Sequence, residues 1–306
     1  MLTDIGKYLL VIGLSLSFFA GYSQDYIDLA KFSYGITPEN KYVDDTLNQN
    51  LKNQLIDFST DLTLPIVLKN ENVFITGIVY EQINLRTENT NGLIYSINPK
   101  IGYKTKHSEK FSSTIMFLPK LSSDLKEINS NHFQFGGVAL FESIKNDNFK
   151  YKFGAYYNQE LFGAFAVPLF GFYYKSKNEK FEANFTLPVY AGLNYKLNNW
   201  LNSGISFNSF VRSYYLGEVE NHYMVKTSNE IYALLQLNLK STSLIIEPQV
   251  GYSVGRSYRV YESSDKIDFG FSAFKFGDDR KQLNQDFENS LIFKVRLLYR
   301  FMIHNS

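Results

Sequence analysis

The chain has 306 residues with 31 basic and 30 acidic side chains, and its formal net charge of +1 excludes the strongly basic surface of a nucleic-acid-binding protein. It contains no cysteine, which excludes disulfides, thiolate metal sites and cysteine nucleophiles. The apolar residues include 27 Phe and 23 Tyr but only four Met and one Trp, a composition typical of β-sheet surfaces and membrane interfaces.

The first segment of the chain has the order of a secretory signal peptide. Lys7 precedes an apolar or small run over residues 8–20, and Gly21 and Ser23 supply the small residues of a cleavage site. We predict a signal peptide over residues 1–23, cleaved near Ser23, and a single barrel domain over residues 24–306. A membrane anchor is the alternative, but the run is shorter than the roughly 20 apolar residues that a spanning helix needs.

After this segment the chain alternates between apolar and polar residues in stretches of roughly 9–11 residues, the length of a tilted transmembrane strand. Phe149, Tyr151 and Phe153, for example, alternate with Lys150 and Lys152. The sequence therefore predicts an all-β fold, a transmembrane antiparallel up-and-down β-barrel of about 14 strands. Twelve strands are the alternative, because the segments within residues 165–195 are short and interrupted by proline.

A secreted, soluble β-sandwich or barrel would also show alternation. Its apolar faces would need a second layer to cover them, and the chain has no segment left for that purpose.

The connections between the predicted strands are of two kinds, which define the two sides of a membrane. Short polar turns rich in Asn, Lys and Ser are assigned to the periplasm, at residues 69–72, 104–110, 145–148, 175–180, 198–199 and 240–242. Mostly longer polar connections are assigned to the cell exterior, at residues 36–53, 84–91, 120–131, 212–229 and 256–289. Residues 267–276 alternate again and could extend a hairpin above the membrane inside the last long loop.

The last strand, over residues 290–301, has the clearest pattern. Every second residue is apolar, and Lys294, Arg296 and Arg300 lie on the opposite face. Charged residues on one face are costly against lipid but compatible with a watery lumen. A final strand that ends in an aromatic residue, here Phe301, is how outer-membrane barrels are recognised by the barrel-assembly machinery, which is therefore a predicted partner.

Across all predicted strands, the polar face gives a set of candidate lumen-lining residues that leans basic. These are Lys100, Glu142, Lys150, Lys152, Glu182, Arg212, Glu247, Lys294, Arg296 and Arg300. In an open lumen, such rings of charge would favour anions. In a narrow lumen, the same residues would pair across it and close it.

No catalytic or metal-ligating constellation stands out. The four histidines are scattered; His132 with Asp124, or His222 with Glu220, could be cast as a rim protease pair, but solvated loop residues have the same spacing. The acidic pairs at residues 44–45 and 278–279 lack the ligand spacing of a calcium loop. We therefore predict no enzymatic activity, no metal site and no cofactor.

Residues 28–34, 58–68 and 188–195 resemble a family of uncharacterised outer-membrane β-barrel proteins from the Bacteroidota, and the resemblance covers nearly the whole mature chain. It implies fold and location and no known activity. A weaker similarity in size and origin points to the type IX secretion membrane-protein family, whose early Asn-Pro-Ala-Tyr-Ala-Gly signature is absent here.

The resulting prediction is an integral protein of the cell outer membrane, in contact with lipid and lipopolysaccharide, that acts as a pore or transporter for small solutes. The alternative is a non-conducting barrel that serves as an adhesion, assembly or secretion-accessory partner through its long outer loops.

Overall fold

The computed structural model describes residues 26–43, 52–87, 91–128, 130–217, 221–239 and 242–302. The predicted signal peptide and its cleavage site lie outside these residues. The strands are β1 (Tyr26–Ile36), β2 (Asn53–Val67), β3 (Val73–Thr87), β4 (Asn91–Ser108), β5 (Phe111–Ser123), β6 (Phe133–Asn146), β7 (Phe149–Glu160), β8 (Gly163–Lys175), β9 (Phe181–Thr186), β10 (Tyr190–Lys196), β11 (Leu201–Leu216), β12 (His222–Asn238), β13 (Leu244–Glu262), β14 (Phe269–Phe271), β15 (Phe274–Phe276) and β16 (Leu291–Met302).

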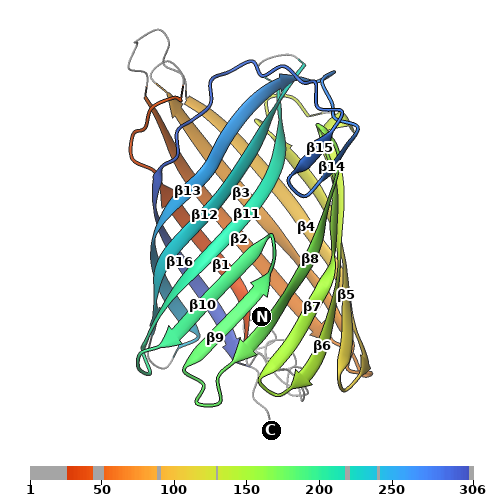
Figure 1. Ribbon diagram of the computed structural model, residues 1–306, viewed down its shortest axis with the longest axis vertical. Helices are drawn as coiled ribbons and strands as arrows, with labels where there is room; N and C mark the ends of the chain where they lie inside the picture. The colour runs from red at the N-terminus through yellow and green to blue at the C-terminus, as the bar shows by residue number, and fades with distance from the viewer. Residues whose placement is uncertain are drawn as a thin grey trace, which may run out of the picture.

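These strands form a closed ring. β1 to β13 pair in sequence order, and β16 closes the ring between β13 and β1 (Figure 1). β14 and β15 form a hairpin outside the ring, which leaves a 14-stranded antiparallel barrel and confirms the predicted fold. A short 3₁₀ helix, η1 (Ser130–His132), precedes β6. Among the residues that the structure describes, no helix is long and apolar enough to cross a membrane.

The two ends of the barrel differ in their connections. Tyr26 pairs with Met302, so the first and last strands meet at one end, which we call the terminal end. The strands there are joined by short turns such as 109–110 and 147–148, where Asn146 Oδ1 accepts the Asn148 N–H. The longer connections, including 263–290 with the β14–β15 hairpin, lie at the opposite end, the loop end. The expected hairpin within residues 267–276 is therefore present.

Residues 212–229 were expected to form a long loop, and this prediction is wrong. β11 runs to Leu216 and β12 starts at His222, so only residues 217–221 connect them. Likewise, β13 runs to Glu262 and shortens the predicted loop at 256–289. The polar residues of these stretches make contacts between strands inside the barrel, and a pattern of polarity alone cannot separate this arrangement from a solvated loop.

The wall of the barrel is apolar outside and polar inside, the inverse of a soluble protein. On β7, Tyr151, Phe153 and Tyr157 are exposed, whereas Lys150 and Lys152 between them are buried. An outward apolar face of this kind is that of a membrane barrel, whose lipid-facing residues alternate with residues facing the lumen.

The β9–β10 hairpin is much shorter than its neighbours. β8 pairs with β9 only through Tyr173–Lys175, with one further bridge between Phe170 and Leu187, and β11 pairs with β10 only as far as Asn208. Beyond the tip of this hairpin, towards the loop end, no described strand of the ring lies between β8 and β11 (Figure 1). We call this break in the wall the seam.

Candidate functional site

The charged residues predicted for the lumen meet partners from other strands, several of them from non-neighbouring strands. Arg212 on β11 contacts Glu81 on β3, and Tyr26 on β1 donates to Glu182 on β9 over 2.8 Å. Strands that are not adjacent in the wall can touch only across the interior. The interior of the barrel is therefore crossed by polar contacts rather than lined by separate charges.

Each of the ten residues predicted to line the lumen contacts a charged or polar side chain on another strand. Glu142 lies between Lys104 and Lys150, at 2.7 and 2.9 Å. The other contacts are Lys100 with Asp61, Lys152 with Asn184 at 2.6 Å, Glu247 with Arg296 and with Gln236 at 2.7 Å, Lys294 with Glu230 at 3.7 Å and Asp57 at 3.8 Å, and Arg300 with Asp28 at 2.6 Å. The basic side chains are thus largely matched by carboxylates. Asp57, Asp61, Glu142 and Glu247 belong to the polar face of the predicted strands, whereas Glu81, Glu230 and Asp28 were not singled out from the sequence.

The loop-end half of the barrel interior is closed by apolar packing. Residues from β2, β3 and β4 on one side meet residues from β11, β12 and β13 on the other side. This apolar seal consists of Leu55, Ile83, Leu85, Ile94, Tyr214, Met224, Tyr258 and Phe287, all of them buried. Because its members come from opposite walls, the packing fills the lumen instead of coating it.

A buried charged group lies directly next to the apolar seal. Glu81 contacts Arg212, its Oε1 lies 2.6 Å from Lys226 Nζ, and it accepts a hydrogen bond of 3.0 Å from the Tyr214 hydroxyl. One carboxylate therefore holds two cations from β11 and β12 against β3. Such a group is stable only as a complete set, because removing one partner leaves an uncompensated buried charge.

Part of the interior towards the terminal end is accessible to solvent. The side chains of Lys31 and Asp61 are 39% and 31% exposed although both face into the barrel. A cavity of about 180 Å³ opens at the terminal end, lined by Glu182, Arg300 and Tyr173 among others. The lumen is therefore a pocket open at one end and sealed at the other.

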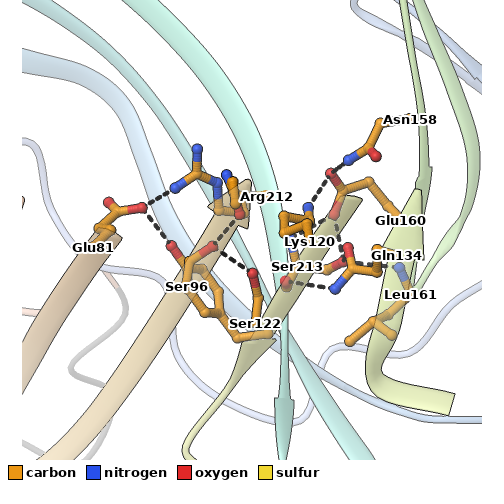
Figure 2. Close-up of polar contacts among 12 residues, drawn as sticks. Glu81, Ser96, Lys120, Ser122, Gln134, Asn158, Glu160, Leu161, Arg212 and Ser213 are labelled. Atoms are coloured by element: carbon orange, nitrogen blue, oxygen red, sulfur yellow. Dashed lines mark hydrogen bonds and ion pairs between the residues drawn. The ribbon is translucent and has the colours of Figure 1, made fainter. Parts of the chain in front are cut away.

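A second buried polar group lies on the other face of β11 (Figure 2). Glu160 on β7 accepts hydrogen bonds from Lys120 Nζ at 2.8 Å and from the backbone N–H and hydroxyl of Ser213 at 2.8 and 2.5 Å. Gln134 donates to the Ser213 carbonyl over 3.3 Å. Arg212 and Ser213, adjacent on β11, thus point to opposite sides, towards β3 and towards β6 and β7. Both faces of the loop-end part of β11 are buried.

Two ion pairs order the last loop, one of them within the loop and the other between the loop and β13. Arg280 holds Asp278 through two contacts of 2.7 and 2.9 Å, and Arg259 holds Asp286 through two contacts of 2.8 and 2.7 Å. The hydrogen bonds from Arg280 lower the pKa of Asp278, and those from Arg259 lower the pKa of Asp286, below the usual 3.8 of an aspartate.

The Arg259–Asp286 pair, which joins β13 to the last loop, predicts how the docking of this loop depends on pH. Because the folded pKa of Asp286 is depressed, this pair stabilises the docked loop at pH values above the unfolded pKa of an aspartate, and the stabilisation is lost as the pH falls through the folded pKa. Protease cleavage within residues 263–290 should therefore be constant between about pH 5 and 8 and rise only below about pH 4. A rise between pH 7 and 5 would show that other groups hold the loop.

The structure buries one histidine of the predicted pairs and places the other in a strand. His132 is fully buried and its ring stacks on Tyr215 with centroids 3.7 Å apart, and His222 lies opposite Glu262 in the β12–β13 ladder. Glu220 and residues 44–45 lie outside the described residues. Within the described ranges, no group of three or more His, Asp or Glu residues has the geometry to hold a metal ion.

Several residues of the closed interior were missed by sequence reasoning, above all Glu81, Lys226, Lys120 and Glu160. Glu81 shares its face of β3 with Val79 and Ile83, so its parity reads as a lipid-facing position. Lys226 falls in the stretch expected to be a loop. Only the contacts that Glu81 makes across the interior with Arg212 on β11 and Lys226 on β12 explain why a carboxylate lies at this position.

The chain is similar in architecture to several solved barrels, at low scores. The toluene transporter TodX of Pseudomonas putida has a TM-score of 0.33 and 10% identity over 89% of this chain and 90% of that chain. OprB of Pseudomonas putida has 0.38 and 8% over 90% and 94%, and the translocator domain of the autotransporter NalP of Neisseria meningitidis has 0.37 and 10% over 98% and 95%. No curated protein matches the chain.

A family model described as a domain of unknown function, DUF6268, matches residues 25–300, which is almost the whole barrel. The match includes every strand from β1 to β15, all but the last two residues of β16, and all of the buried charged groups described above. The chain therefore belongs to the DUF6268 family.

Proposed function

We propose that this protein is an integral outer-membrane barrel that transports small solutes through a gated lumen. The observation that carries the proposal is the asymmetry of the interior, which is charged and open to solvent towards the terminal end but closed by the apolar seal at the loop end. A standing pore would need both ends open, whereas a purely structural barrel has no need of a solvated, charged pocket.

The proposed orientation follows the usual arrangement of bacterial barrels, with the terminal end and its short turns in the periplasm and the loop end outside the cell. In this setting the outer wall contacts outer-membrane lipid and lipopolysaccharide. Insertion would follow removal of the signal peptide near Ser23, with the strand ending at Phe301 read by the barrel-assembly machinery.

The sealed loop end also favours a second candidate. A non-conducting barrel could use its loops for adhesion, assembly or secretion, because the described part of the last loop is ordered by ion pairs and projects from the wall. A measurement of ion conductance distinguishes a transporter from a purely structural barrel, because only the transporter should conduct.

Purified, refolded protein in planar bilayers tests the proposal. We expect long closed periods interrupted by discrete openings, because the apolar seal must separate before ions pass. Complete absence of steps in every lipid and at every voltage would contradict transport and support the non-conducting barrel. A steady open conductance would contradict the closure described here.

A further inference from the structure

The seam has no backbone ladder joining its two edges. Along β11, the edge that faces the seam is satisfied at Ser213 by side chains, since Glu160 accepts the Ser213 N–H and Gln134 donates to the Ser213 carbonyl, and at Tyr215 by a single bridge to β5, where the Asp124 N–H donates to the Tyr215 carbonyl. Edge strands expose unpaired N–H and C=O groups, which proteins cover in other ways when no neighbouring strand exists. The buried polar group around Glu160 therefore covers the β11 edge at Ser213.

The β8 edge of the seam is covered by the last loop. β14 pairs in parallel with β8, with Gly270 opposite Phe165 and Phe271 opposite Ala166, and the Ser272 N–H donates to the Ala166 carbonyl over 2.8 Å. Pro168 lies on the same edge. Two residues after Pro168, the Phe170 N–H donates to the Leu187 carbonyl on the seam side of β8. Because N–H groups two residues apart point to the same side of a strand, an ordinary residue at position 168 would expose its N–H to the seam, and proline has none.

Behind the hairpin lies a buried apolar cluster between β8 and the outward face of β12. This seam cluster consists of Phe162, Phe165, Val167, Leu169, Tyr223, Val225, Tyr261 and Ile267. The same face of β8 continues to Tyr173, which lines the cavity at the terminal end. An apolar track along β8 thus connects the seam with the solvated pocket, in an interior that is otherwise rich in charges.

The β14–β15 hairpin presents aromatic side chains at the lipid-facing surface. Phe271, Phe274 and Phe276 are 43%, 68% and 56% exposed. Phe271 lies opposite Ala166 on β8, and Ala166 lies opposite Tyr157 on β7, which is also exposed on the outer face. Exposed aromatic residues of barrels gather at the membrane interface. The hairpin therefore continues the lipid-facing surface across the seam.

The hairpin and the residues that flank it are held by side-chain contacts and a short stretch of backbone pairing. Two residues of β14 pair with β8, the Ile267 N–H donates to the Phe162 carbonyl over 2.8 Å, and Arg280 stacks on Tyr261 with 4.3 Å between guanidinium and ring centroid. All of these can separate without breaking the ladder of the 14-stranded ring. Separating two neighbouring strands at any other place in the ring would instead break a complete ladder of backbone hydrogen bonds.

We propose that the seam is a lateral portal in the barrel wall and that the β14–β15 hairpin is its lid. Displacing the lid would join the outer leaflet to the seam cluster and to the apolar track on β8. The fitting ligand is an apolar or amphipathic small molecule that partitions into the bilayer. This proposal rests on the proposed transport function and names the route and the class of solute.

The test uses the natural absence of cysteine to place a single reporter, Val225→Cys, in the seam cluster. The protein is reconstituted in phosphatidylcholine vesicles and reacted with a membrane-partitioning pyrene maleimide or a charged sulfonated maleimide. The lid is locked by the pair Ala166→Cys and Phe271→Cys, oxidised before labelling. A matched control pair, Phe271→Cys and Phe274→Cys, bridges the two strands of the hairpin and leaves its docking free.

We expect the pyrene reagent to label the reporter and the lid lock to slow labelling by more than about tenfold, with recovery on reduction. The control pair should leave the rate unchanged, and the sulfonated reagent should react slowly throughout. Equal rates with and without the lock would overturn the lid, and fast reaction with the sulfonated reagent would overturn a portal to lipid. A heat-modifiable shift on unboiled gels confirms that each variant is folded.

The labelling rate does not depend on conductance. If bilayers show no channel steps but the lock still controls labelling, the proposed transport fails and the portal stands as a lipid-facing binding site. If steps appear but the lock has no effect, the portal fails and axial transport stands.

Discussion

Glu81→Gln is expected to open the lumen to ions. The substitution keeps the size of the side chain but leaves Arg212 and Lys226 together without a carboxylate, and their repulsion acts directly beneath the apolar seal. Breaking a buried ion pair from one side typically costs about 3–5 kcal/mol. We expect a loss of that order in the free energy of unfolding and frequent or persistent openings in planar bilayers.

The control for this variant is Glu39→Gln in the exposed pair Lys52–Glu39, whose side chains are 55% and 64% exposed at 2.9 Å. Exposed pairs contribute about 0–1 kcal/mol, so neither stability nor conductance should change measurably. If Glu81→Gln stays as closed and as stable as the unmodified chain, Glu81 does not hold the seal in place.

Glu160→Gln is expected to destabilise the barrel by a similar amount. Lys120 and Glu160 are almost fully buried, with side chains 5% and 1% exposed, and Glu160 also covers the β11 edge through Ser213. Loss of the carboxylate leaves Lys120 as an unpaired buried cation, which costs about 3–5 kcal/mol. Urea unfolding of vesicle-inserted protein measures the change.

A double variant separates the effect of the unpaired charge on the free energy of unfolding from the effect of altered packing. Lys120→Met removes the cation that Glu160→Gln leaves unpaired, so the double variant should recover much of the lost stability. Strictly additive losses in the cycle would show that the two side chains do not stabilise each other. The coupling also reports on the seam, because both residues belong to the cover of the β11 edge.

The barrel itself is predictable from alternation, because lipid and lumen impose opposite polarity on the two faces of each strand. β7 follows this rule along its whole length, and Lys150 and Lys152 are buried as their parity implies. The rule fails where both faces are buried, as at the loop-end parts of β11 and β12, where Met224 joins the apolar seal and Val225 joins the seam cluster.

The pairing of charges is not predictable from the pattern, because the partners are far apart in sequence. Lys294, Arg296 and Arg300 form a basic stripe when the last strand is read alone. In the folded barrel they meet carboxylates on β2, β12, β13 and β1, so the stripe is largely neutralised. Pro168 did carry a local signal for the seam, since it removes a ladder donor from the middle of a strand.

The sealed loop end is tested most directly by the reactivity of single cysteines along the interior. In detergent-solubilised protein, where both mouths meet the solvent, Asp61→Cys in the solvated part and Ile83→Cys in the apolar seal are reacted with a charged sulfonated maleimide. Closure predicts that Asp61→Cys reacts at least about tenfold faster, which corresponds to about 1.4 kcal/mol of protection at Ile83. Equal, fast reaction at both positions would show a lumen open from end to end and would contradict the gated barrel.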